Sequence, residues 1–323
     1  MIRDREYSSS LAPHMKGLVE AKRARGFDYA SAAYTLERLD RFCLDGGLSP
    51  AMVTRELAES WAEAVPSEGG ASRQTRMSAL RQLALHERSL GLDAYVPRDF
   101  SARERPVAYI PSQRETKLLF AAIDAYCDER YWYMADGYRV AFRLMRFCGM
   151  RIAECAGMAA ADVDVREGAL TVRRSKGAKD RVVYMADDMA GMVGEHLSRL
   201  RSGLGFSPDW LFPGKDPSTH ILKNTFCRKF AQFWAQVPGS ASRGRHPTPH
   251  SLRHAFVVDR MNRWMAEGVD LPQMMPYLAA YLGHDGANET FYYYHQVEEA
   301  FSIVRSRDAV SCRVIPEVIP YEA

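Results

Sequence analysis

No arrangement of cysteines in the sequence could bind zinc or build a disulfide framework. The six cysteines are scattered, with no CxxC pair and no His/Cys ligand spacing. The chain also lacks any apolar run near the roughly 18 residues that a membrane span requires, and its N-terminus, MIRDREYSSS, is charged. These absences predict a cytoplasmic protein in a reducing compartment, without a metal site, a disulfide or a membrane partner.

Charge of either sign is not in excess, since 43 basic and 40 acidic residues give a net charge of +3. This balance neither indicates nor excludes a polyanionic partner, so local clusters of charge must decide. The composition is that of a globular protein, 47% hydrophobic and 26% charged. At 323 residues the chain is long enough for two domains, because single cores stop growing near about 250 to 300 residues.

The spacing of apolar residues, and the breaks in it, divide the chain. Over 9–91 apolar residues recur at helical spacing, with breaks at RGFD, DGGLSP and PSEGG, which predicts a bundle of about four helices. The stretch 92–113 is rich in proline and charge, which is typical of a linker. Ser112 and Glu115 then form a capping-box pattern that begins another helix. The predicted parts are a helical domain 1–100, a linker 101–112, a second domain 113–305 and a tail 306–323.

The second domain is expected to be mainly helical with one small β-sheet. Short β-rich runs flank a KGAKD turn and predict a β-hairpin over 169–185. A helical pattern precedes the hairpin at 135–148. Further helices are predicted near 188–202, 222–236, 250–266, 271–281 and 288–304. The whole chain is therefore predicted to be mainly α with a small β-sheet.

The predicted hairpin concentrates positive charge. Five cationic residues lie within nine positions, with one acid between them. Such a tip suits a polyanion, although a short basic run is more often a solvated turn. The cationic residues are Arg173, Arg174, Lys176, Lys179 and Arg181.

A second candidate for anion binding is the stretch HPTPHSLRHAF. Thr248 can cap a helix there with Pro249 at its first position, so His250 and Arg253 share one helix face. A helix N-terminus, a guanidinium and an imidazole all supply donors to phosphate oxygens. The alternative is a buried ion pair with a structural carboxylate.

A third stretch, FCGMRIAECAGM, places Arg151 in an otherwise apolar neighbourhood. An unpaired guanidinium would be costly there, and Glu154 at i+3 can pair with it locally.

Four motifs in order resemble the tyrosine recombinase (phage integrase) family over roughly 113–305. They are GMRIAECAGM, SKGAKDR, HSLRHAF and LGHDGANETFYYYH. The N-terminal helices resemble, less specifically, the core-binding (SAM-like) domain of that family. The resemblance implies that the two domains form a C-shaped clamp around duplex DNA.

The resemblance also implies a role for individual residues. The two arginines that clamp the scissile phosphate fall on Arg151 and Arg253, and Glu154 orients Arg151. The hairpin lysine that protonates the leaving oxygen falls on Lys176, with Lys179 as the alternative. The remaining matches are His250 for proton removal, His284 as a donor to the phosphate, and Tyr293 as the nucleophile, with Tyr292 the rival on the helical wheel.

The implied function is site-specific cleavage and rejoining of DNA through a 3′-phosphotyrosine and a Holliday junction, for integration or excision of a mobile element. We expect core-site DNA as partner, a homotetramer on synapsed DNA, a nucleoid-associated location and no cofactor. Type IB topoisomerase activity and a non-catalytic DNA-binding accessory role are the alternatives. The tail 306–323 is a hypothetical docking segment for a neighbouring subunit, and packing on its own domain is the alternative. Besides the hairpin residues, the candidate DNA contacts are Arg73, Arg76, Arg243 and Arg245, with a solvated helix face as the alternative for Arg73 and Arg76.

Overall fold

The computed structural model describes residues 5–65, 68–98, 108–173, 180–240 and 246–284. The chain divides into two compact units, Met1–Pro106 and Val107–Ala323. The boundary falls inside the stretch 101–112 that the sequence predicts as a linker. The expected helix 288–304 and the tail 306–323 lie outside the described residues.

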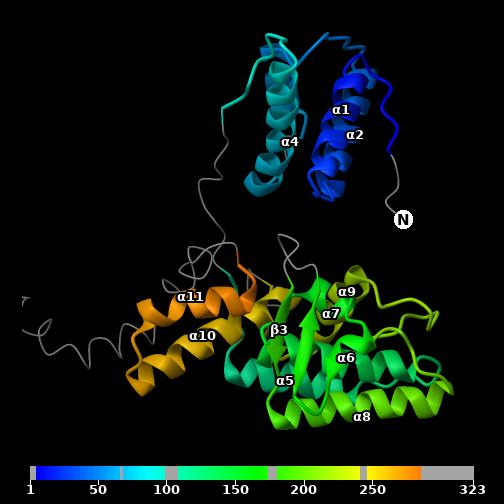
Figure 1. The fold of residues 1–323 in the computed structure, drawn as a ribbon, viewed down its shortest axis with the longest axis vertical. Coiled ribbons are helices and arrows are strands. Elements are labelled where there is room, and N and C mark those ends of the chain that lie inside the picture. The colour runs from blue at the N-terminus through cyan, green and yellow to red at the C-terminus, as the bar shows by residue number, and fades with distance from the viewer. Residues whose placement is uncertain (1–4, 66–67, 99–107, 174–179, 241–245, 285–323) are drawn as a thin grey trace, which may run out of the picture. The chain divides into compact units, whose positions relative to one another are not determined.

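The described residues of the first unit form four helices, as the sequence predicts; three of them are labelled in Figure 1. Their apolar faces meet in one core, in which Met15, Leu36 and Leu80 are completely buried. Thr54 begins the third helix by accepting a hydrogen bond from the Leu57 amide. The helices are α1 (Ala12–Ala24), α2 (Ala30–Asp45), α3 (Arg55–Glu63) and α4 (Gly70–Ser89).

Arg76 on α4 is not the DNA contact that the sequence predicts. Its side chain is 1% exposed and lies over the ring of Trp61. The guanidinium donates to Oε2 of Glu68 at 2.9 Å and to the carbonyls of Trp61 and Ala62. Because its donors are bonded to protein acceptors in the core, Arg76 stabilises this unit from inside. Arg73, which is partly exposed, stays a prediction.

The second unit is mainly helical with a three-stranded antiparallel sheet, which confirms the predicted fold class (Figure 1). The strands are β1 (Val163–Asp164), β2 (Ala169–Val172) and β3 (Arg181–Tyr184), in the order β1-β2-β3. The predicted hairpin is β2 paired with β3, with Leu170 opposite Val183. The helices are α5 (Gln113–Ala125), α6 (Trp132–Phe147), α7 (Ile152–Ala156), α8 (Asp187–Leu204), α9 (Lys223–Trp234), α10 (Pro249–Glu267) and α11 (Leu271–Leu282), with a 3-10 turn, η1 (Ala160–Asp162), before β1.

Helix α6 is the central element of this unit, since it packs against both α8 and α10. On α6, the ring of Phe142 makes edge-on contacts with Phe226, Phe230 and Phe233 of α9. Buried aromatic contacts of this kind hold the α6 axis firmly. The loop that follows α6 is therefore fixed in position, and it carries Arg151.

Local capping signals placed two helices correctly. Ser112 and Glu115 form the predicted capping box at the start of α5, with the Ser112 amide donating to the Glu115 carboxylate at 2.8 Å. Thr248 precedes α10 and donates its amide to Oγ of Ser251, and Pro249 is the first helical residue. None of the described helices is long and apolar enough to cross a membrane.

Candidate active site

A tight turn after α6 positions Arg151. Gly149 has a φ of +66°, a left-handed conformation that favours glycine. A Cβ on Gly149 would lie 2.6 Å from Cδ1 of Phe256 on α10, so glycine also permits close packing of that helix. Beyond this turn Arg151 becomes the residue that precedes α7.

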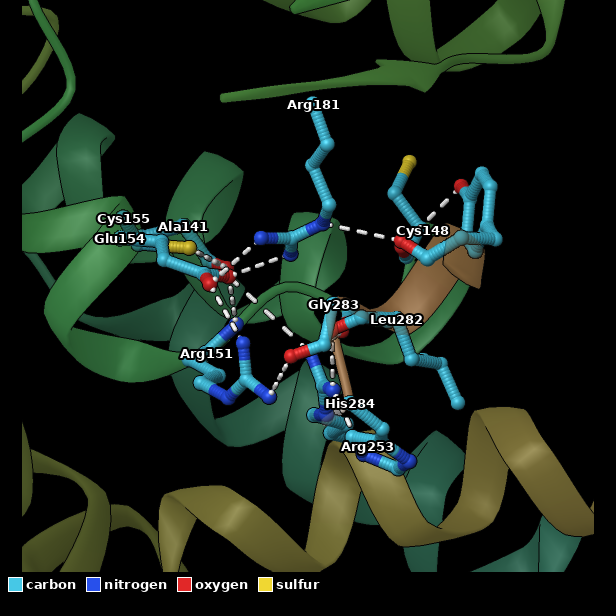
Figure 2. Close-up of polar contacts among 12 residues, drawn as sticks. Ala141, Cys148, Arg151, Glu154, Cys155, Arg181, Arg253, Leu282, Gly283 and His284 are labelled. Atoms are coloured by element: carbon cyan, nitrogen blue, oxygen red, sulfur yellow. Dashed lines mark hydrogen bonds and ion pairs between the residues drawn. The ribbon is translucent and has the colours of Figure 1, made fainter. Parts of the chain in front are cut away.

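Glu154 is the carboxylate around which the site is organised (Figure 2). Its Oε2 accepts from the Arg151 amide at 2.7 Å, and its Oε1 accepts from Nη1 of Arg151 at 2.9 Å. The expected contact between Glu154 and Arg151 is thus present. Burial raises the pKa of Glu154, but the hydrogen bonds and charge of Arg181, followed by those of Arg151, lower it below its ordinary value. The group is a carboxylate at neutral pH.

Arg181 forms a second ion pair with Glu154 and is not the DNA contact that the sequence predicts. Its Nη1 and Nη2 donate to Oε1 and Oε2 of Glu154, each at 2.7 Å, and Nε donates to the carbonyl of Tyr281 at 2.9 Å. The side chain is only 9% exposed. Strand alternation was the missed signal: Val183 is buried while Val182 and Tyr184 are exposed, so position 181 faces inward.

Arg253 on α10 is fully buried and ties together two distant turns. Its Nη1 donates to the carbonyl of Gly149 at 2.6 Å, and its Nη2 donates to the carbonyl of Leu282 at 2.7 Å. The same Nη2 lies 3.0 Å from Nε2 of His284. Because a guanidinium has only donors, Nε2 of His284 accepts this hydrogen bond, and the proton of the neutral ring is on Nδ1.

The end of α11 presents His284 to the site. Gly283 closes the helix with a φ of +63°, and the His284 amide donates to the Ala279 carbonyl. The carbonyl of Gly283 accepts from Nη2 of Arg151 at 2.7 Å. Arg151 and Arg253 thus bind consecutive carbonyls of one turn, which brings both guanidiniums next to His284 (Figure 2).

His250, in the first turn of α10, is a neutral imidazole at physiological pH. Part of the residue is open to solvent, yet surrounding protein atoms, followed by the positive charges of Arg253, Arg151 and Lys223, lower its pKa to about 4. Its ring centroid lies 4.3 Å from that of His254. Sequence reasoning did not select His254. Burial, followed by the influence of His250, Arg253 and His284, lowers the pKa of His254 to about 3.

Arg173 is a sequence-predicted residue that the structure places away from this cluster. Its side chain is exposed and donates to Asp162 of η1. Within the described part of the chain, no group of three or more His, Cys, Asp or Glu residues could hold a metal ion. The predicted residues Arg174, Lys176, Lys179, Arg243, Arg245, Tyr292 and Tyr293 lie outside the described residues.

Comparison with known proteins identifies the family. The model of the phage integrase family matches residues 113–300, more than half of the chain. The chain belongs to the phage integrase family. Members of this family, the tyrosine recombinases and integrases, are DNA strand-transfer enzymes, and the resemblance inferred from the four motifs is confirmed.

Relatives of this integrase-family chain extend beyond the matched domain. A protein of Sinorhizobium fredii named as integrase/recombinase y4rB is 27% identical over 290 residues, which cover 85% of this chain and 89% of the relative. The tyrosine recombinase XerD of Pseudomonas aeruginosa is 31% identical over 161 residues, or 49% of each chain.

Solved structures share the fold. The Tn1549 transposon integrase in complex with transposon right end DNA superposes with a TM-score of 0.63 at 16% identity, covering 91% of this chain and 98% of that one. A lambda integrase dimer bound to a core site gives a TM-score of 0.60 at 17% identity, covering 87% of this chain and 94% of that one. At these identities the likeness concerns the fold alone.

Proposed function

We propose that this chain is a site-specific tyrosine recombinase that cleaves and rejoins DNA through a 3′-phosphotyrosine intermediate and a Holliday junction, and that it integrates or excises a mobile element. One observation carries the proposal. Two arginines and two histidines that match the family motifs, far apart in sequence, converge on one site: Arg151, His250, Arg253 and His284.

Arg151 and Arg253 neutralise the scissile phosphate. A guanidinium stays charged at any physiological pH, so both side chains supply positive charge that stabilises the phosphate oxygens. Each arginine is held by backbone carbonyls and stays near Glu154, so the pair is preorganised before the phosphate arrives. His284 donates to the same phosphate from Nδ1, because its Nε2 accepts from Arg253.

His250 accepts the proton of the attacking tyrosine. Its lowered pKa leaves the ring neutral, so a lone pair is available at pH 7. Tyr293 then forms a P–O bond through its phenolic oxygen, and the bond from phosphorus to the 5′-oxygen breaks. Lys176 protonates that departing 5′-oxygen, which gives a free 5′-hydroxyl. One phosphoester replaces another, so rejoining requires no ATP, and in this proposal the two arginines supply the charge neutralisation.

Names of similar proteins support DNA as the partner. One related fold is described as a lambda integrase tetramer bound to a Holliday junction, and another as the Tn1549 transposon integrase in complex with a circular intermediate DNA. We propose by analogy that this chain assembles as a homotetramer on synapsed core sites and acts on a mobile element. The tail 306–323 docks on a neighbouring subunit in this proposal, and its deletion should impair tetramer assembly.

The test is covalent trapping in EDTA on nicked duplexes made from DNA that flanks the protein's own gene. Denaturing electrophoresis detects a protein–DNA adduct, and peptide mapping locates it. We expect the adduct on Tyr293, its loss in Tyr293→Phe and its retention in Tyr292→Phe. An adduct on Tyr292 would move the nucleophile by one residue. Binding without an adduct would favour the accessory role, and relaxation of supercoiled DNA by a monomer would favour the topoisomerase alternative.

A further inference from the structure

Arg181 joins three elements of the site through one side chain. From β3 it reaches α7, where its two terminal nitrogens form a two-bonded ion pair with Glu154 (Figure 2). It also reaches the last turn of α11, where Nε donates to the Tyr281 carbonyl. Tyr281 is three residues before His284. Arg181 therefore contacts the residues that hold two members of the proposed site: Glu154, which binds Arg151, and the helix turn that precedes His284.

Glu154 accepts hydrogen bonds from both Arg181 and Arg151. Both of its oxygens accept from Arg181 and from Arg151, and Nη1 of Arg253 lies 4.0 Å from Oε2. Three guanidiniums surround one carboxylate, so positive charge exceeds negative charge in the cluster. If Arg181 were absent, Arg151 would be the only hydrogen-bonded guanidinium left to offset the negative charge of Glu154. Less of the positive charge of Arg151 would then act on a phosphate.

We propose that Arg181 is a positioning residue for the recombination reaction: it neutralises Glu154 and fixes the end of α11, so that Arg151 and His284 meet the scissile phosphate with full charge and correct geometry. This inference rests on the proposed function. It differs from the sequence-based expectation, in which Arg181 binds DNA directly. The two roles predict different kinetics, because a positioning residue changes the rate of cleavage of bound DNA and a phosphate contact changes affinity.

The experiment compares Arg181→Gln and Arg181→Lys with wild type and with Arg199→Gln. Arg199 forms a two-bonded pair with Asp136 elsewhere in the same unit, so its replacement removes the same charge and the same kind of ion pair. The readouts are the single-turnover rate of adduct formation at saturating nicked DNA from the gene's flanks, and the Kd for that DNA.

For Arg181→Gln we expect adduct formation about 100-fold slower, the size of effect that a displacement of about 1 Å produces, with little change in Kd. Arg181→Lys, which keeps the charge without the planar fork, should be about tenfold slower. Arg199→Gln should cleave like wild type. On DNA with a neutral methylphosphonate at the scissile position, the defect of Arg181→Gln should shrink, because the charge of Arg151 is no longer required.

Each other outcome has a defined meaning. If Arg181→Gln cleaves bound DNA at the wild-type rate and only its Kd rises, the positioning role is overturned and the DNA-contact role is restored. If the methylphosphonate leaves the defect unchanged, Arg181 does not act through the charge of Arg151. If Arg181→Gln fails to fold, as a thermal melt would reveal, a wild-type rate for Arg181→Lys would overturn the inference. Absence of an adduct with wild-type protein would instead overturn the proposed function.

Discussion

Nη2 of Arg253 and Nε2 of His284 lie 3.0 Å apart although the residues are separated by 31 positions in the chain. The contact exists because the Leu282 carbonyl accepts from the same nitrogen, which holds the end of α11 against α10. An arginine that serves as both structural tie and proposed phosphate ligand is preorganised for its task. The same arrangement makes the arginine hard to replace.

Lysine at position 253 should therefore slow cleavage strongly even though the charge is kept. A lysine cannot reach both the Gly149 and Leu282 carbonyls with a planar fork, so His284 also loses its fixed donor. We expect Arg253→Lys to lower the single-turnover rate by about 10²–10³-fold, as for the loss of one preorganised donor in other active sites. The measurement is adduct formation at saturating DNA, and a rate within threefold of wild type, on the order of RT in free energy, would contradict it.

Stability should fall as the solution is acidified, partly because of the two neighbouring histidines on α10. The pKa of His254 is lowered from 6.5 to about 3, and that of His250 to about 4. Between each folded value and 6.5 the unfolded chain binds more protons than the folded chain, so the free energy of unfolding rises with pH across this window. Urea unfolding of wild type and His254→Asn from pH 7 to pH 4 measures the effect.

The variant should show a shallower pH dependence over that range. Parallel curves for His254→Asn and wild type would mean that this ring does not titrate differently in the two states. His86, whose pKa burial also lowers, lies in the first unit and provides the control as His86→Asn. Its replacement should leave the contribution of the second unit intact.

Replacing Arg76 should destabilise the first unit and not act through lost DNA contacts. Arg76→Ala would leave the Glu68 carboxylate, 8% exposed, without its 2.9 Å partner and would remove the donor to the Trp61 carbonyl. Breaking a buried pair in this way costs about 3–5 kcal/mol. The matched control is Arg55→Ala, which breaks an exposed pair with Glu59 and should cost less than about 1 kcal/mol.

Denaturant unfolding of both variants gives the comparison. A loss of stability in Arg76→Ala no larger than that in Arg55→Ala, together with weaker DNA binding, would return Arg76 to the DNA-contact role that the sequence suggests.

Asp136 on α6 and His196 on α8 form a buried polar pair. Oδ2 of Asp136 lies 2.6 Å from Nδ1 of His196, whose Nε2 lies 2.9 Å from the Leu211 carbonyl, and Arg199 donates to both carboxylate oxygens. Both ring nitrogens of His196 thus lie within hydrogen-bond distance of an oxygen atom. Asp136→Asn should lower the free energy of unfolding by about 3–5 kcal/mol.

The control for Asp136→Asn is Glu195→Gln, which removes the other, exposed partner of Arg199. That change should cost less than about 1 kcal/mol in the same unfolding experiment. Equal losses of unfolding free energy in the two variants would show that the buried pair stabilises the protein no more than the exposed pair does. Cleavage activity should be unaffected in the folded fraction of either protein, since neither residue contacts the candidate site in the described structure.

The sequence by itself determined the local elements and the identity of the motifs. Capping at Ser112 and Thr248, turn signals and the alternation of the hairpin act within a few residues, so each element could be predicted without its neighbours. The motif order also determined the family. Arg151 and Glu154 were paired correctly because they are only three residues apart, at the start of one short helix.

Only the tertiary structure decided which charged residues are internal. Arg76 and Arg181 both read as exposed cations in their local sequence, and both are buried against carboxylates. The partner of Arg181 lies 27 residues earlier, on a different element. A buried arginine is stable only when a distant carboxylate or carbonyl compensates its lost hydration, and that partner is supplied by folding and cannot be read from neighbouring residues.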